Sequence, residues 1–287
     1  MLRGSFAAFG LAIAFCIGIP VAQAGPFEDG YVAYGRGAYA DALRLFQQAA
    51  EAGHAGAQLN LGNMYLTGQG TARDDAAAAA WYRRAADSGN AGAQFSLGTL
   101  YRNGWGVPQD YGRAIEWYRR AAEQDFALAE NNIGAMYDKG LGVPRDDGEA
   151  VRWYQRAAGH GLAIAQFNLG LMLQKGRGGP TNPTEARRLF ERAAESGIAG
   201  AQNQLGILYA TGAAGLARDY VQADKWFTIA ASRAADDGVR ALALQNQDRL
   251  APQMTPGQRA DAQKLARAWS PQGATLAEER GVPRQVQ

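Results

Sequence analysis

A 36-residue period is the feature that most constrains what this 287-residue chain can fold into. A Leu-Gly pair marks each unit, with Ile in place of Leu in one of them. The copies are Leu61-Gly62, Leu97-Gly98, Ile133-Gly134, Leu169-Gly170 and Leu205-Gly206. An aromatic pair or a variant of it follows in each unit, and then a double alanine, as in Trp117-Tyr118 and Ala121-Ala122. Self-similarity at this spacing predicts an array of structural units, each of which packs against its neighbours.

Each unit has the pattern of two helices. Ala93, Leu97 and Tyr101 are spaced at i, i+4 and i+8, so they share one face of a helix. Residues 110–122 carry a second apolar stripe, and Asp110 precedes it where a helix N-cap is expected. No strand pattern interrupts the period. The local unit is therefore predicted to be a helix–turn–helix pair.

A single pair of short helices cannot bury both apolar stripes, whereas stacked pairs can. The predicted fold is an all-α, right-handed α-solenoid of 36-residue units. Its expected parts are a signal peptide at 1–24, an atypical N-terminal repeat at 25–54, five repeats at 55–90, 91–126, 127–162, 163–198 and 199–232, C-terminal capping helices at 233–269 and a disordered tail at 270–287.

The first 24 residues have the pattern of a secretory signal peptide. Arg3 supplies the positive start, residues 6–21 are almost wholly apolar, and residues 22–24 have the small-x-small form of a cleavage site. We expect cleavage between Ala24 and Gly25, and a periplasmic or secreted protein without a stable membrane span. The alternative is an uncleaved membrane anchor, which the short and interrupted apolar run disfavours.

Charge and cysteine content exclude several classes of function. Lys and Arg number 29 against 27 acidic residues, so the chain lacks the basic excess of a nucleic-acid-binding protein. The one cysteine, Cys16, lies inside the predicted signal peptide. A chain cleaved after Ala24 therefore has no disulfide, no thiolate metal site and no cysteine nucleophile.

The sequence shows no recognisable catalytic motif. His54 and His160, the two histidines, fall at different places in the repeat unit, and the H-E-x-x-H spacing of zinc proteases is missing. Neither G-x-S-x-G nor S-x-x-K occurs. We therefore expect no catalytic residue, no cofactor and no metal site. A metal site built from the distant histidines and scattered carboxylates stays open but unsupported.

The loop NGWGVPQD at 103–110 has two glycines ahead of a helix, which is also typical of phosphate-binding loops. It recurs, however, with the period of the fold, at 68–74, 140–146 and 176–182. No strand precedes it, and the charge of Asp110 would repel a phosphate at the helix start. The glycines are therefore predicted to be architectural. Trp105, which does not recur, is the candidate functional residue of the loop.

The pattern A-x-x-x-L-G-x-x-Y-x-x-G-x-G-V-x-x-D-x-x-x-A-x-x-W-Y-x-x-A-A, from Ala93 to Ala122, resembles the Sel-one-like repeat, a relative of the tetratricopeptide repeat. The resemblance covers roughly residues 27–232. Leu173 departs from the tyrosine of the pattern, and the second glycine is displaced in residues 212–219. The resemblance implies a curved array whose first helices line a concave face that binds protein segments.

Candidate binding residues follow from helix geometry. If Leu97 is the centre of the buried side, then Phe95, Thr99, Arg102 and Asn103 point away from it at about 100° per residue. Extending this face along the period gives the predicted protein-binding residues Leu59, Asn63, Phe95, Thr99, Arg102, Asn103, Asn131, Asp138, Lys139, Phe167, Leu171, Lys175 and Asn203. The alternative is that these side chains pack beneath neighbouring helices.

Two classes of function are consistent with the sequence. The first is an exported, non-enzymatic scaffold that binds a protein or peptide partner of the cell envelope. By family resemblance, it would act in assembly, signalling or control of exported polysaccharide. The second is an envelope enzyme of the β-lactam-binding or peptidoglycan-acting type. The lack of cysteine after residue 24 and of an acylation motif disfavours it.

Overall fold

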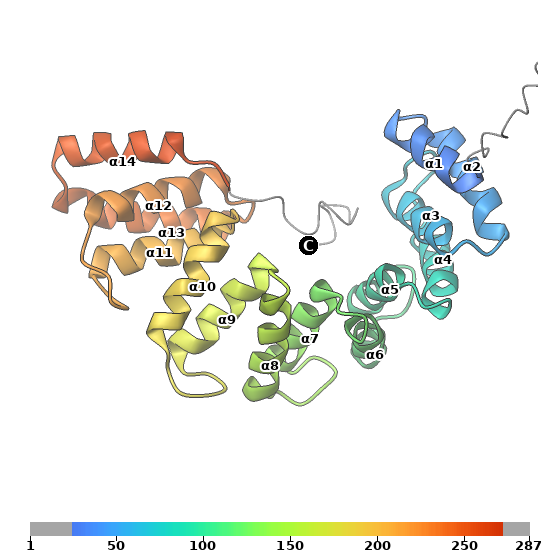
Figure 1. Ribbon diagram of the computed structural model, residues 1–287, viewed down its shortest axis with the longest axis horizontal. Coiled ribbons are helices and arrows are strands. Elements are labelled where there is room, and N and C mark those ends of the chain that lie inside the picture. Colours follow the sequence, from blue (N-terminus) through green and yellow to red (C-terminus); the bar gives the residue numbers. More distant parts are fainter. Residues whose placement is uncertain (1–24, 272–287) are drawn as a thin grey trace, which may run out of the picture.

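The computed structural model describes residues 25–271, and in this range the chain is all-helical, as predicted. The helices of the array are α1 (Pro26–Gly35), α2 (Tyr39–Glu51), α3 (Ala55–Thr67), α4 (Asp75–Asp87), α5 (Ala91–Asn103), α6 (Tyr111–Ala122), α7 (Ala127–Lys139), α8 (Asp147–Gly159), α9 (Ala163–Lys175), α10 (Pro183–Glu195), α11 (Ala199–Thr211) and α12 (Tyr220–Arg233). They are followed by α13 (Asp237–Leu250), the 3-10 helix η1 (Ala251–Gln253) and α14 (Pro256–Ala268). Figure 1 shows these helices stacked in chain order along an arc, which confirms the predicted solenoid.

Side-chain caps start the helices where the sequence predicts them. Asp110 accepts a hydrogen bond from the backbone N–H of Arg113 and so satisfies a donor of the first turn of α6. The aspartates that begin the other second helices do the same, at Asp74, Asp146 and Asp219. In α14, Thr255 and Gln258 form a reciprocal capping box. The helix boundaries are therefore encoded locally.

Within each unit, the glycine of the Leu-Gly pair lies against an aromatic ring of the second helix. A Cβ atom added to Gly98 would lie 2.8 Å from Cδ1 of Tyr118, and one added to Gly170 would lie 2.6 Å from Cε1 of Phe190. Tyr118 and Phe190 are fully buried. The ring occupies the space where any other residue would place its side chain, so glycine sets the distance between the two helices.

The glycines of the 103–110 loop are architectural. Gly104 and Gly106 have left-handed φ values of 72° and 65°. A Cβ atom on Gly106 would collide with the backbone carbonyl of Asp75, at the start of α4 in the preceding unit. The loop of the next unit repeats this approach, because a Cβ atom on Gly142 would lie 2.7 Å from the carbonyl carbon of Tyr111. Both loops are therefore in close contact with the unit before them.

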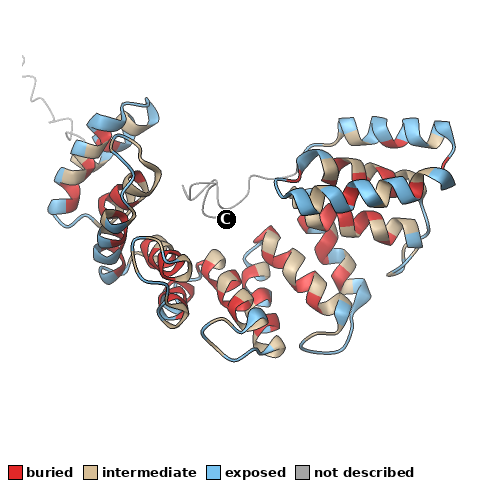
Figure 2. Cartoon of the chain, turned by 180° about the vertical axis from the view of Figure 1, so that it is seen from behind, coloured by how far each residue is buried: buried red, intermediate tan, exposed pale blue. Residues whose placement is uncertain are grey.

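The helices α13 and α14 pack on the last repeat. Leu250, Met254 and Ala262 are buried together with Phe227 of α12. The outer surface of α14 is largely exposed (Figure 2). None of the helices between residues 25 and 271 has both the length and the apolar character of a bilayer-spanning segment. The predicted signal peptide, with Ala24 of its cleavage site, and nearly all of the predicted disordered tail lie outside the described residues.

We predict that Gly106→Ala destabilises the array more than Gly215→Ala. Both glycines have a positive φ, but a Cβ atom at Gly215 meets nothing within 4 Å. Gly215→Ala should cost about 1 kcal/mol of backbone strain, and Gly106→Ala about 1–3 kcal/mol more, because it also overlaps the preceding unit. Urea denaturation of both variants measures the difference. Equal losses would contradict the proposed close contact between units.

Candidate functional site

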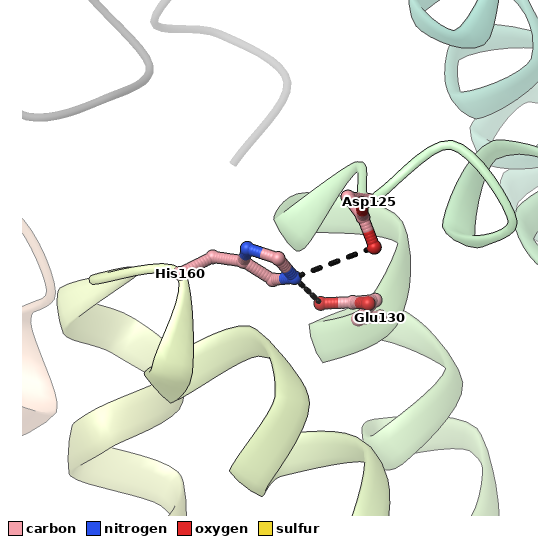
Figure 3. A group of neighbouring side chains, drawn as sticks. All are labelled: Asp125, Glu130 and His160. Carbon is pink, nitrogen blue, oxygen red and sulfur yellow. Dashed lines mark ion pairs between the residues drawn. The ribbon is translucent and has the colours of Figure 1, made fainter.

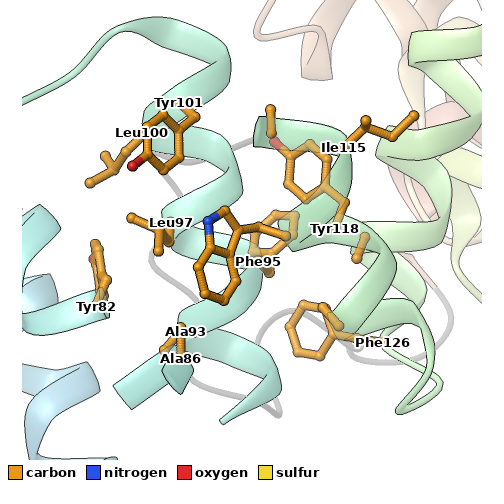
Figure 4. Packing of buried hydrophobic residues seen from close by; sticks show 14 of the residues in the cluster. Tyr82, Ala86, Ala93, Phe95, Leu97, Leu100, Tyr101, Ile115, Tyr118 and Phe126 are labelled. Carbon is orange, nitrogen blue, oxygen red and sulfur yellow. The ribbon is translucent and has the colours of Figure 1, made fainter. Parts of the chain in front are cut away.

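Four of the predicted binding residues are buried, so their assignment to an exposed face was wrong. Phe95 and Thr99 are only 3% and 2% exposed, and Asn131 and Asn203 are also buried. The ring of Phe95 lies between those of Tyr118 and Phe126, with centroid distances of 5.7 Å and 5.3 Å (Figure 4). These residues belong to the core of the array.

The physical reason is that a first helix packs against its own second helix and the second helix of the preceding unit, and side chains on its remaining face also meet the next unit. Asn131 accepts a hydrogen bond of 3.0 Å from Asn168, which lies one unit further along the array. Phe167 extends toward Gly200 of the following unit, where a Cβ atom would lie 2.7 Å from its ring. The column from Leu59 to Asn203 therefore packs between successive units, as the alternative interpretation of the sequence proposed.

Asn63, Thr99 and Leu171, which lie one turn further along the first helices, are also largely occupied in packing. The hydroxyl of Thr99 donates to the backbone carbonyl of Phe95 at 3.1 Å and lies 3.1 Å from the hydroxyl of Tyr118. Asn63 is half-buried and accepts a hydrogen bond of 2.7 Å from Tyr82. Leu171 is half-buried and packs against the core of the last repeats. A half-buried polar column lies one position after the column from Leu59 to Asn203, at Asn60, Ser96, Asn132, Asn168 and Gln204.

Three of the predicted residues, Arg102, Asn103 and Lys139, do come together, around a hollow of about 510 Å³. We call this hollow the Trp105 groove. Its lining residues are Arg102, Asn103, Trp105, Gln109, Tyr111, Asn132, Ala135, Met136, Lys139 and Leu141. They come from the end of α5, the loop that follows, the start of α6, and α7 with the loop behind it.

The loop side of the groove is tied to the helices around it. The side-chain amide of Gln109 donates to the backbone carbonyl of Arg102 at 2.9 Å and to the hydroxyl of Tyr111 at 3.1 Å. Trp105 is half-buried and packs on the core cluster of α4 to α7. The described residues that line the groove include two cationic side chains, Arg102 and Lys139, and no acidic side chain. This combination fits an acidic group and an adjacent apolar side chain.

The other two predicted charged residues lie outside the groove. Asp138 forms an ion pair with Arg177, whose guanidinium also contacts Asp147 at 2.6 Å. The hydrogen bonds from Arg177 hold the pKa of Asp147 well below its usual range. Asp138 therefore belongs to a contact between units. Lys175 is exposed and occupies the same place in its unit as Lys139.

A second cluster, which the sequence reasoning missed, lies at the hairpin of α7 and α8. Ligand atoms of Asp125, Glu130 and His160 lie within 4.8 Å of one another (Figure 3). Nε2 of His160 is 3.6 Å from Oε2 of Glu130 and 3.7 Å from Oδ1 of Asp125. Burial raises the pKa of Glu130, more than the charge of Arg156 lowers it. The expectation of no metal site treated His160 as isolated. His160 lies 36 residues after Gln124, and the same turns of successive units lie side by side. His160 therefore lies beside Asp125 and Glu130.

Comparison with known proteins places the array in a family. A model of the Sel1 repeat matches residues 32–54, 55–90, 91–126, 127–162, 163–198 and 199–234. The structure of a Sel1 repeat protein from Oxalobacter formigenes is similar over 88% of this chain and 100% of its own, with 28% identity and a TM-score of 0.73.

A second solved structure is c5321, a protective antigen present in uropathogenic Escherichia coli strains and displaying an SLR fold. It matches over 91% of this chain and 64% of its own, with 28% identity and a TM-score of 0.57. A search of curated proteins finds no match. The resemblance drawn from the Ala93–Ala122 pattern is confirmed, because the matched repeats span most of the chain. The chain belongs to the Sel1 repeat family.

Proposed function

We propose that this protein is an exported, non-enzymatic scaffold that binds a protein segment in the Trp105 groove. Sel1 repeat proteins generally serve as protein-interaction scaffolds and are typically without enzymatic activity. The observation that carries the proposal is the grouping of Arg102, Trp105 and Lys139 around one hollow. Tryptophan, tyrosine and arginine are the residues that most often dominate the energy of protein interfaces.

The chemistry of the groove suggests the class of segment. Arg102 and Lys139 offer positive charge, whereas Trp105, Tyr111 and Leu141 offer apolar surface beside it. A peptide with a carboxylate, either a side chain or its own C-terminus, next to a bulky apolar residue would satisfy both parts. The amides of Asn103 and Asn132 can hydrogen-bond its backbone. A basic segment would be repelled.

Selection of displayed random peptides on the purified protein, followed by fluorescence anisotropy of the selected peptides, tests this site. We predict acidic–apolar peptides whose affinity falls at least tenfold, about 1.4 kcal/mol, in Lys139→Glu and in Trp105→Ala. Lys175→Glu is the matched control, because it reverses the equivalent charge one unit later and outside the groove. The affinity of Lys175→Glu for the selected peptides should stay within about twofold of that of the wild-type protein.

Equal weakening by Lys139→Glu and Lys175→Glu would show general charge attraction and contradict the groove assignment. Retained affinity in Trp105→Ala would contradict it as well. A Phe95→Ala variant is unsuitable for this test, because Phe95 is buried and its truncation would leave a cavity that destabilises the core.

Export is the second part of the proposal and rests on sequence alone. Residues 1–24 combine Arg3, an apolar run and a small-x-small site before Gly25. A scaffold cleaved there would meet partners of the cell envelope, and assembly, signalling or control of exported polysaccharide are the roles that we propose for it.

Intact-mass measurement of the protein recovered from the periplasmic fraction of its host checks the export proposal. We expect a chain that begins at Gly25, because Ala22 and Ala24 provide the small side chains that signal peptidase requires. Replacing Ala24 with a bulky residue such as Arg should leave an uncut precursor. Recovery of the uncut wild-type chain from the cytoplasm would contradict export.

A further inference from the structure

Three departures from the repeat pattern come together at the turn that precedes α7, at the start of α7 and at the end of α8. The first is Asp125, which has a left-handed φ of 57°. At this position the other units have glycine with positive φ, namely Gly53, Gly89, Gly161 and Gly197. A left-handed conformation costs an aspartate more than a glycine. An acidic side chain therefore stands here in place of the residue that fits the backbone best.

The second departure is Glu130, whose equivalents are Gln58, Gln94, Gln166 and Gln202. The amide of Gln94 donates to the carbonyl of Ala86 in the preceding helix, as the amides of Gln58 and Gln202 do to theirs. A carboxylate cannot donate. Instead, Arg156 donates to the equivalent carbonyl, that of Ala122, at 3.2 Å.

Glu130 is 0% exposed, and neither of its carboxylate oxygens makes a hydrogen bond with good geometry. Nη2 of Arg156 forms an ion pair with Oε1 at 3.0 Å. The other oxygen, Oε2, points toward His160 at 3.6 Å, beyond hydrogen-bonding distance (Figure 3). A buried carboxylate oxygen without a partner carries a large desolvation cost, and a cation would remove it.

The third departure is His160, which replaces Ala52, Ser88, Gln124 and Ser196 of the other units. One unit earlier, Gln124 occupies the same place and its amide donates to Oε1 of Gln94 at 2.9 Å and to the carbonyl of Gly89 at 3.0 Å. In the earlier unit, the corresponding three residues therefore carry no charge and hydrogen-bond to one another. In the later unit, the same three places hold an imidazole and two carboxylates.

The spacing of these atoms suits a metal ion. Zinc–ligand bonds of about 2.0–2.2 Å in a tetrahedron place ligand atoms about 3.3–3.6 Å apart. The 3.6 Å and 3.7 Å distances from His160 Nε2 to the two carboxylates are close to this value. An imidazole with two carboxylates favours zinc and other divalent transition metals over calcium or magnesium, which prefer oxygen alone.

We propose that Asp125, Glu130 and His160 bind a divalent transition-metal ion, with Zn²⁺ as the best fit. The ligand atoms are Nε2 of His160 and one oxygen of each carboxylate. Asp125 is 72% exposed at its side chain, so the site is open to solvent and leaves a fourth position for water or a partner. Nη2 of Arg156 lies 3.0 Å from Oε1 of Glu130 and 3.9 Å from Oδ1 of Asp125, and its charge makes the affinity lower than that of structural zinc sites.

The other repeats supply variants that the fold already accepts. Asp125→Gly, Glu130→Gln and His160→Ser each restore the residue found in the equivalent position of at least two other units. Zn²⁺ binding is measured by isothermal titration calorimetry on the protein without a histidine tag, and Co²⁺ absorption reports the coordination. We expect each single variant to bind Zn²⁺ at least about tenfold more weakly, and the triple variant to lose the site.

His54→Asn is the matched control, because it removes the other histidine and keeps its structural role. His54 caps α3 by accepting from the N–H of Ala57, and Asn90 caps α5 in the same way. This variant should bind Zn²⁺ like the original protein. Zn²⁺ should also raise the melting temperature of the original and of His54→Asn, but not of the triple variant.

Three results would overturn the proposal. The first is a wild-type protein that binds Zn²⁺ no better than the triple variant. The second is unchanged affinity in Glu130→Gln, because the buried carboxylate is the feature that most requires a cation. The third is loss of binding in His54→Asn. Circular dichroism of each metal-free variant establishes that the helical array is retained in the comparison.

Discussion

The contact between a glycine of the first helix and an aromatic ring of the second is the interaction on which the rest of the array depends. It occurs in all six units, as the pairs Gly30–Phe46, Gly62–Tyr82, Gly98–Tyr118, Gly134–Tyr154, Gly170–Phe190 and Gly206–Phe227. The missing side chain lets each ring fill the space between its helices, and the rings are nearly or fully buried. Because the same contact sets the distance between the two helices of every hairpin, the loops and helix ends of each hairpin meet the neighbouring unit at equivalent positions.

The elements, their caps and the turn glycines could be predicted from sequence because each depends on residues close in the chain, such as Asp110 and Gly104. The exposed face could not, because Phe95 and Asn131 are also covered by residues beyond their own helix pair, namely Phe126 at the start of α7 and Asn168 of α9. A helix that packs against more than one neighbour buries more than one of its faces. The amphipathic pattern of the sequence identifies only the most apolar of these faces. The grouping of His160 with Glu130 depends on contacts about 30 residues apart in the chain.

Positions that repeat build the array, and positions that depart from the repeat carry its individual chemistry. Trp105 stands where the other loops have Gln69, Leu141 and Arg177, and Glu130 stands where the other units have glutamine. Helix α7 connects the two proposed sites, since Glu130 lies in its first turn and Lys139 is its last residue. A metal ion at one end of α7 would therefore restrain the helix that forms one wall of the Trp105 groove.

In this account, repeated residues build the fold and non-repeated residues bind the partner. An exchange of loops between units tests this division of roles directly. Replacing residues 104–110, GWGVPQD, with residues 140–146, GLGVPRD, changes Trp105 and Gln109 and keeps both glycines, the proline and the capping aspartate. Melting temperature and affinity for a selected peptide are measured on the same sample. The account predicts a melting temperature within about 4 °C of the original and loss of peptide binding. Retained binding in the folded exchange variant would contradict it.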